Sequence, residues 1–341
     1  MRIKILFTTV IVLFALSFSN AQTKYDFSSV DNLLQDAVPK IGGSAVLIVM
    51  NNQVLYQKAF GEFTIDEVVM IASASKWLSA GVIMSLVDEG KLSLNDPVSR
   101  YITAFTGKKG AITIRQLFSH TSGLSRENEL VLMNPLITLE TAANRIAQME
   151  LAAEPGTEFA YGGISMQVAG RIAEITGGKL WNELFKERIA DPLEMKNTDY
   201  GGLLGITKNP MIAGGAKSCL KDYGNFLSMI INKGVFKSKH VLSETAIQEM
   251  LKNQIGDAVI KFSPYSFFTS ERITYGIGVW RAQVDPQTDD VIVASCQGAF
   301  GFSPWIDRQK NLYGVLLVRN RLQNVMPVYV ELRKMIDIIL K

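Results

Sequence analysis

The chain has 341 residues, of which 48% are hydrophobic and 20% are charged, so it can bury a substantial core. Its formal net charge is only +3 at pH 7, which gives no reason to expect a nucleic-acid partner or an anionic membrane surface. His120 and His240 are the two histidines, and neither lies in a cluster with metal-ligand spacing. We therefore expect no metal.

Residues 1–21 have the pattern of a cleaved signal peptide. Arg2 and Lys4 precede an apolar stretch at 5–18, and Ser19-Asn20-Ala21 resembles a small-x-small cleavage site. An uncleaved membrane anchor is the alternative, but the stretch is short for a span of about 20 residues. We therefore expect a periplasmic or secreted protein without a stable membrane anchor, in which 22–341 form a single domain.

The mature chain begins with a predicted β-hairpin. Apolar segments at 44–50 and 53–60 are joined by Asn51-Asn52, a pair that favours a tight turn. The spacing then becomes helical over 74–89, where apolar residues repeat at three and four, and Gly90 supplies a stop signal.

The next part is expected to be mostly helical, over about 105–240. Helices are predicted at 113–118, 138–149, 165–175 and 180–189, with others beginning near Ser218 and after an N-cap at Ser243. The period then returns to two, which predicts strands at 273–281, 291–295, 302–306 and 312–319 before a final helix at about 325–339. Strands at both ends with helices between indicate an α+β fold, in which one sheet is built from both termini and carries a helical insertion.

Ser73-Ala74-Ser75-Lys76 places a serine and a lysine three residues apart at the start of the predicted helix. Residues at this spacing share a helical face, so the amine can reach the hydroxyl. The helix N-terminus favours negative charge on the attacking oxygen. A lysine held away from water there has a lowered pKa and can act as a general base.

The spacing alone is weak evidence, because Ser218-Cys219-Leu220-Lys221 repeats it. That second copy is interpreted as a helix start with a surface lysine. No G-x-S-x-G motif occurs, which argues against the usual α/β-hydrolase route. His120, in Ser-His-Thr-Ser-Gly, is predicted to lie in a hydrogen-bonded loop, and His240 to be exposed. A serine hydrolase of this sequence would therefore use Lys or Tyr as its base.

Five segments in order resemble the serine β-lactamase-related family, which includes class C β-lactamases, penicillin-binding D-Ala peptidases and esterases. The resemblance runs from about residue 40 to 320 and is carried by IASASKWLSAGVIMSLVDEGKLSLNDPV (71–98), ITIRQLFSHTSGL (112–124), PGTEFAYGGISMQVAGRIAEIT (155–176), AGGAKSCLKDYGNF (213–226) and GAFGFSPWID (298–307). It implies an antiparallel sheet flanked by helices, an all-helical insertion, and a site between them. It also implies that Ser73 is the nucleophile and Lys76 its activator.

The second motif of this family is Tyr-x-Asn, and the matching residues here are Tyr161-Gly162-Gly163. The resemblance implies that Tyr161 shares proton transfer with Lys76. A core or turn tyrosine is the alternative. Gly163, at a substrate-binding position, lacks the amide that would bond the lysine and a substrate's amide group, so the sequence departs from the family here.

The third motif is Lys-Thr-Gly or His-x-Gly on an edge strand, and it is matched by Cys296-Gln297-Gly298. These three positions would contact substrate. Cys296 cannot supply the positive charge that holds the carboxylate of a β-lactam or peptide, whereas Gly298 would let a substrate lie close to the strand. The backbone N–H groups of Ser73 and Ala299 would form the oxyanion hole, which needs no particular side chain.

Cys296 leaves three alternatives open. It could be a reactive thiol, a disulfide partner of Cys219 or a small packing residue, and we favour packing.

These features together predict an exported serine hydrolase that forms an acyl-enzyme on Ser73. This serine chemistry implies no organic cofactor. Its substrates are expected to be small esters or amides, including ones derived from the cell wall. A β-lactamase or D-Ala-D-Ala carboxypeptidase of the same family is one alternative. A non-catalytic binding protein on the same scaffold is the other.

Overall fold

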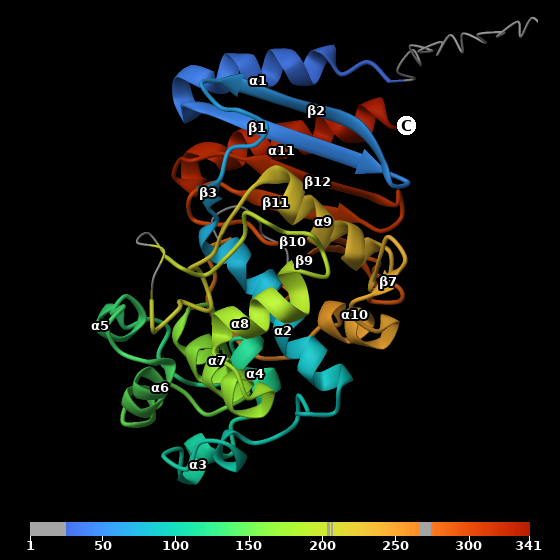
Figure 1. Ribbon diagram of the computed structural model, residues 1–341. Helices are drawn as coiled ribbons and strands as arrows, with labels where there is room; N and C mark the ends of the chain where they lie inside the picture. Colours follow the sequence, from blue (N-terminus) through green and yellow to red (C-terminus); the bar gives the residue numbers. More distant parts are fainter. Residues whose placement is uncertain (1–24, 203–204, 206, 266–273) are drawn as a thin grey trace, which may run out of the picture.

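A six-stranded antiparallel sheet forms one part of the computed structural model, which describes residues 25–202, 205, 207–265 and 274–341 (Figure 1). The signal peptide predicted at 1–21 lies outside these described residues. The strand order is β2-β1-β12-β11-β10-β9. The strands are β1 (Gly43–Met50), β2 (Gln53–Gly61), β9 (Trp280–Val284), β10 (Val291–Ser295), β11 (Ser303–Asp307) and β12 (Leu312–Leu317).

The two ends of the chain meet inside this sheet. Strand β1 pairs with β2 through the predicted hairpin, in which Asn51 and Asn52 adopt φ angles of 52° and 61°. Both values suit the turn that matches the twist of a two-stranded ribbon. On its other side β1 pairs with β12, with Val46 opposite Leu316. The α+β fold with an antiparallel sheet built from N- and C-terminal strands is therefore confirmed.

Two long helices cover one face of the sheet (Figure 1). Helix α1 (Ser28–Ile41) and helix α11 (Leu322–Ile339) share a hydrophobic core with the side chains of β1, β11 and β12 that face these two helices. The sequence prediction missed α1, although Val30, Leu34, Ala37 and Ile41 recur at four, three and four residues and are buried.

Helix α9 (Leu220–Ile231) packs on the opposite face of the sheet, against β1, β11 and β12. Helix α2 (Ser75–Asp88) is central, and every residue from Ser75 to Leu86 in it is buried. Such a helix, apolar on all sides, belongs in the middle of a protein. The main core joins it to the sheet and to the helical region. The other helices are α3 (Gly107–Gly110), α4 (Ile114–Phe118), α5 (Glu129–Leu132), α6 (Leu139–Ala147), α7 (Ile164–Gly177), α8 (Trp181–Phe185) and α10 (Glu244–Leu251), with short turns η1 (Ala72–Ala74), η2 (Val98–Arg100) and η3 (Lys186–Ala190).

The predicted helical insertion also contains short strands, so it is not built from helices alone. Strands β4, β5, β6 and β7 lie in it, and with β3 and β8 from outside it they form three pairs apart from the main sheet, β3 with β5, β4 with β8, and β6 with β7. Their bounds are β3 (Val69–Met70), β4 (Glu158–Ala160), β5 (Lys217–Ser218), β6 (Val235–Phe236), β7 (Lys239–His240) and β8 (Val259–Phe262). Strands of two to four residues are too short to show a period of two.

The strand predicted at 273–281 is wrong in position. The observed strand β9 begins at Trp280, and the described residues before it form a turn in which Gly276 N–H donates to the Val279 carbonyl. A Cβ at Gly276 would overlap the Met250 carbonyl, and one at Gly278 would lie 2.6 Å from the Lys76 carbonyl oxygen. The backbone is thus packed against helices α10 and α2 at these positions. Residue 273 lies outside the described residues.

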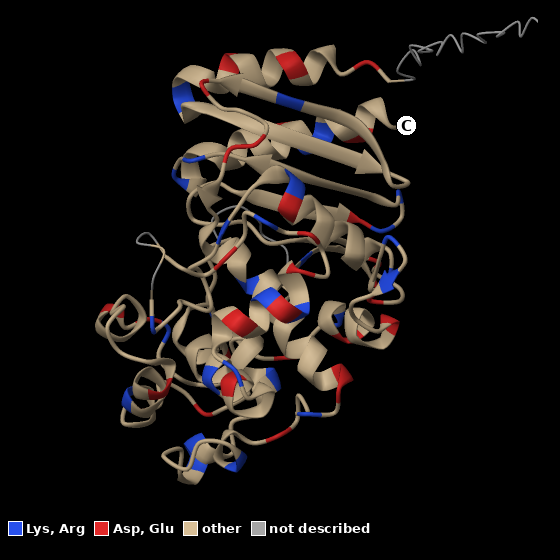
Figure 2. Cartoon of the chain, in the orientation of Figure 1, with Lys and Arg blue, Asp and Glu red and all other residues tan. Residues whose placement is uncertain are grey.

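Charges of both signs are interspersed over the sheet and the helical region (Figure 2). Within the described part of the chain, no helix is both long enough and apolar enough to cross a bilayer.

Candidate active site

Ser73 lies in the short turn η1, between strand β3 and helix α2. The residue before it, Ala72, has a φ of 45°, a left-handed conformation that costs energy for a residue with a Cβ. The Ser75 hydroxyl stabilises this bend, because it donates to the Ala72 carbonyl at 2.6 Å and accepts the Ala216 N–H at 3.0 Å. The serine-bearing turn is therefore fixed from both sides, and Ser73 itself remains partly exposed.

Lys76 is buried one helical turn further on, and its side chain reaches Ser73. Its Nζ donates to Ser73 Oγ at 3.2 Å and to the Ala213 carbonyl oxygen at 2.9 Å. Burial lowers the pKa of the Lys76 amine to about 8, although the charge of nearby Glu127 opposes this. The structure therefore brings the predicted pair together, with a lysine that loses its proton more easily than usual.

Tyr161 lies against the same amine. Lys76 Nζ is 4.5 Å from the centroid of the Tyr161 ring, which also stacks on Trp280. Burial raises the pKa of the Tyr161 phenol well above its ordinary value, and a hydrogen bond with the Ser73 side chain only partly offsets this. The phenol is thus protonated near neutral pH, and Lys76 is the member of the pair that titrates closest to neutrality.

Cys296 packs behind the serine. It is fully buried, and its Sγ donates to the Ser73 carbonyl oxygen at 3.2 Å. Burial raises the pKa of this thiol to about 12, so it is neutral. Cys219 and Cys296 are both free, so the structure does not support the disulfide alternative. The position that carries a cation in the Lys-Thr-Gly motif holds a neutral packing group.

Close packing against the backbone of Ile71 requires a glycine at position 298. A Cβ here would overlap the Ile71 carbonyl oxygen and lie 3.3 Å from the Ala72 Cβ. The close approach of the serine-bearing turn therefore requires a glycine here, and the expectation that this glycine also makes room for a substrate stays a prediction. Ala299 follows it and is exposed. The backbone N–H groups of Ser73 and Ala299 donate no hydrogen bond within the described residues.

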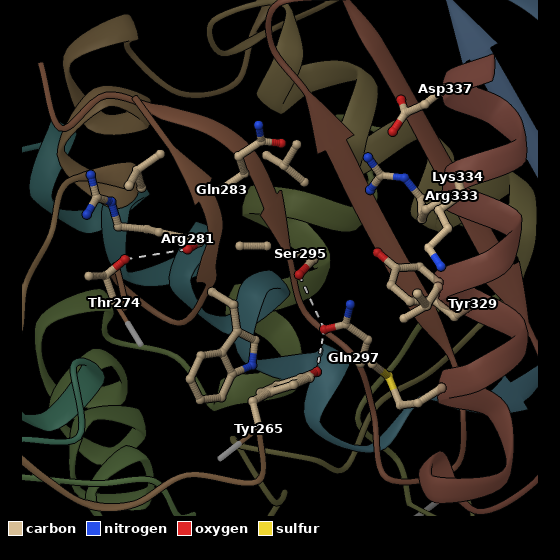
Figure 3. A pocket seen from close by; sticks show the side chains of 16 residues that line it. Tyr265, Thr274, Arg281, Gln283, Ser295, Gln297, Tyr329, Arg333, Lys334 and Asp337 are labelled. Carbon is tan, nitrogen blue, oxygen red and sulfur yellow. Dashed lines mark hydrogen bonds between the residues drawn. The ribbon is translucent and has the colours of Figure 1, made fainter. Parts of the chain in front are cut away.

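Gln297 does not face Ser73. Its side chain lies on the other face of β10, where its Oε1 accepts hydrogen bonds from the Tyr265 hydroxyl and, at 3.3 Å, from the Ser295 hydroxyl (Figure 3). It lines a cavity of about 650 Å³ between strands β9 and β10 and helix α11. Cys296 and Gln297 follow the last residue of β10, and the Cys296 N–H still donates to the Pro304 carbonyl of β11. Successive side chains of extended backbone point in opposite directions, which separates Cys296 from Gln297.

His120 lies in a hydrogen-bonded loop, as predicted, and its ring is buried among aromatic rings. The ring centroid lies 4.7 Å from that of Tyr161 and 5.1 Å from that of Tyr275. Within the described residues neither ring nitrogen has a partner, and only the backbone carbonyl of His120 is bonded, to Ala160 N–H. Burial lowers the pKa of this imidazole well below its ordinary value, and the charge of Lys76 adds to the effect. His240 is exposed on β7.

Glu127 lies beside the second motif, and it was not identified as a site residue from the sequence. Its Oε2 would be 3.4 Å from a Cβ built on Gly163, the N-cap of helix α7. Charge interactions link this carboxylate to Lys76. Its only sequence signal is an acidic residue shortly after the Ser-His-Thr-Ser-Gly-Leu segment, which by itself indicates nothing.

The ordered segments are matched by a family model. The Beta-lactamase model covers residues 30–328, which is most of the chain. The chain belongs to the Beta-lactamase family. As a member of this family it is a serine hydrolase with the β-lactamase/transpeptidase-like fold.

Two curated relatives of this Beta-lactamase family member match part of its length. The D-alanyl-D-alanine-carboxypeptidase/endopeptidase AmpH of Escherichia coli K12 is 29% identical over 215 residues, covering 58% of this chain and 54% of AmpH. The protein flp of Staphylococcus aureus MW2 is 29% identical over 187 residues, covering 50% of this chain and 38% of flp. The chain thus spans about half or less of these relatives.

Solved structures match over nearly the whole chain. A putative β-lactamase from Bacteroides dorei is 34% identical, with a TM-score of 0.84 and coverage of 93% of this chain and 99% of that one. EstCE1, described as a hydrolase with promiscuous acyltransferase activity, is 21% identical with a TM-score of 0.75, and the match covers 90% and 97% of the two chains. The second likeness shows the fold alone.

Proposed function

We propose that the chain is an exported hydrolase of small esters and amides that works through an acyl-enzyme on Ser73. The observation that carries this is the 3.2 Å contact between Lys76 Nζ and Ser73 Oγ, made by a buried amine whose pKa is about 8. A neutral amine at this distance can take the serine proton as the oxygen attacks a carbonyl carbon.

The reaction then proceeds in two halves. The carbonyl oxygen becomes an oxyanion that the N–H groups of Ser73 and Ala299 stabilise. Collapse of this intermediate breaks the bond to the leaving alcohol or amine, which receives the proton held by Lys76. Water then attacks the acyl-enzyme, again giving its proton to Lys76, and the acid leaves as Ser73 recovers its proton. The Tyr161 phenol stays protonated and hydrogen-bonded with the serine side chain, next to the proton that Lys76 transfers.

The neutral thiol at Cys296 favours esters and small amides over β-lactams. Loss of a charge-assisted contact to a substrate carboxylate weakens binding by about ten- to a hundredfold. The similarity to AmpH favours D-Ala-D-Ala carboxypeptidase activity as the second candidate. Turnover of a nitrophenyl butyrate, a chromogenic cephalosporin and a D-Ala-D-Ala peptide under the same conditions separates the three reactions. Fast cephalosporin turnover with negligible esterase activity would reject the ester proposal.

The nucleophile is tested by fluorophosphonate labelling. We expect the wild-type chain to be labelled and Ser73→Ala to be unlabelled and inactive. Ser218→Ala is the matched control, because Ser218 has the same spacing to a lysine but its Oγ is hydrogen-bonded to Thr198. Equal labelling of Ser73→Ala, or no labelling of the wild type, would instead support the non-catalytic scaffold.

The pH dependence follows from the protonation state of Lys76. The amine must be neutral to accept the serine proton, and burial lowers its pKa to about 8. We therefore expect kcat/KM for a neutral ester to rise with pH to a plateau, with a midpoint near 8 and a tenfold loss per pH unit well below it. A flat profile between pH 6 and 9 would contradict a lysine base with this pKa.

A further inference from the structure

The loop that carries Glu127 is fastened to the second motif by backbone contacts. The Arg126 carbonyl oxygen accepts the N–H groups of Gly163 at 2.9 Å and Ile164 at 3.2 Å. A Cβ on Gly162 would lie 2.7 Å from the Arg126 Cα. Gly162 therefore lets the loop come this close, and the position of Glu127 relative to Ser73 is fixed by the fold.

The Glu127 carboxylate occupies the side of Gly163 from which a side chain would project. Besides Glu127 Oε2 at 3.4 Å, a Cβ there would meet Leu132 Cδ1 at 3.1 Å and the Ala213 Cβ at 3.6 Å. The Ala213 carbonyl is the second acceptor of the Lys76 amine. A carboxylate thus stands next to the lysine pocket, at the position where the Tyr-x-Asn motif would present a neutral amide.

This carboxylate is available to a ligand. Glu127 is exposed, and among the described residues it makes no ion pair within 4.0 Å. The nearest cations in sequence and space are engaged elsewhere: the Arg126 guanidinium stacks on the Phe262 ring at 3.6 Å, and Lys76 binds Ser73 and Ala213. Desolvation raises the pKa of the Glu127 carboxyl, against the charges of Lys76 and Arg126 and a hydrogen bond from the Gly163 N–H. A partly desolvated carboxylate gains more from a cationic partner than one in bulk water.

We propose that Glu127 binds the ammonium group of the substrate, and that the preferred substrates are esters or amides of amino acids with a free amino group. This inference rests on the proposed function, since it assigns the specificity of the same site. It also explains the two departures from the family motifs together. The neutral Cys296 removes a partner for a substrate carboxylate, and Glu127 beside Gly163 supplies a partner for a substrate cation.

The test compares two esters that differ only in the charged group. Alanine benzyl ester, of both hands, and benzyl isobutyrate have similar shapes, because a methyl group replaces the ammonium group in the second. Release of benzyl alcohol is measured at pH 7.0 for each. We expect the wild type to have a kcat/KM at least tenfold higher for the better alanine ester. Glu127→Gln should lower this preference by about ten- to a hundredfold.

Glu129→Gln is the matched control. Glu129 is an exposed acid in the first turn of helix α5, two residues from Glu127. Its loss should leave the preference for the alanine ester unchanged. A wild type without preference, a preference that survives Glu127→Gln, or an equal loss for both esters in that variant would each overturn the inference.

Failure of the proposed function gives a different result. If neither ester is hydrolysed and fluorophosphonate does not label Ser73, the hydrolase proposal itself fails. Hydrolysis of benzyl isobutyrate that depends on Ser73, without preference for the alanine ester, rejects the Glu127 inference alone. Labelling and thermal unfolding of Glu127→Gln show whether its serine is reactive and its fold intact.

Discussion

Lys76→Met is expected to lower kcat/KM for a neutral ester by about 10²–10⁴-fold, which is the range that general acid–base groups contribute. Methionine keeps an unbranched side chain in the buried space but removes the amine that donates to Ser73 Oγ. Steady-state ester hydrolysis measures the loss. The thermal midpoint is expected to change little or to rise, because the variant no longer buries a group that desolvation disfavours in its charged form.

Lys221→Met provides the matched control within the same chain. Lys221 follows Ser218 at the same spacing as Lys76 follows Ser73, but it is exposed on helix α9. Its replacement should leave kcat/KM within about twofold, since exposed substitutions away from a site have small effects. Comparable losses in Lys76→Met and Lys221→Met would contradict the assignment of the base.

Gly298→Ala is expected to lower kcat/KM by about 10²–10³-fold, the usual cost of losing one donor of an oxyanion hole. The new methyl group would overlap the Ile71 carbonyl oxygen and lie 3.0 Å from its carbon, so the backbone has to move. This movement displaces the turn that carries Ser73 from the turn between β10 and β11 that carries Ala299. Ester hydrolysis and thermal unfolding of the purified variant measure the two effects, and some loss of stability is expected as well.

Gly214→Ala controls for a methyl group added beside the same turn. A Cβ at Gly214 lies 3.7 Å from the Ala72 carbonyl carbon and 3.6 Å from Met211 Sδ, which are ordinary contact distances. This variant should retain most of the activity and stability of the wild type. If Gly298→Ala is as active as Gly214→Ala, the close packing of Gly298 is not what aligns the two N–H groups.

Local sequence signals predicted those parts of the fold in which local preference and tertiary packing agree. The Asn51-Asn52 turn and the Ser243 cap, which accepts the Ala246 N–H at 2.9 Å, are examples. The strand predicted at 273–281 was wrong because tertiary packing determines the backbone there. Gly276 and Gly278 let the backbone before β9 lie directly against the backbone of helices α10 and α2, and hydrophobic periodicity carries no information on such contacts.

The candidate site was predictable where it lies on ordered motifs, and not where it depends on loops. The spacing of Ser73 and Lys76 predicted their contact, because a helix fixes the geometry between residues three apart. The positions of two side chains could not be predicted in the same way. Glu127 is brought to the site by backbone contacts between separate loops. Gln297 points away from Ser73 and toward Tyr265, and the motif itself does not indicate which residue of the pair Cys296-Gln297 faces the serine.

The pairing of β1 with β12 has a consequence for how the molecule folds. The first strand of the sheet lacks one of its two neighbours until nearly the entire chain is available. Contacts between such distant segments form slowly, because the intervening chain must lose its freedom before they are gained. The Cys296 thiol and the Ser73 carbonyl that it contacts are 223 positions apart. A chain emerging from the ribosome therefore stays incomplete as an enzyme until its last strands arrive, which delays any hydrolysis until synthesis has ended.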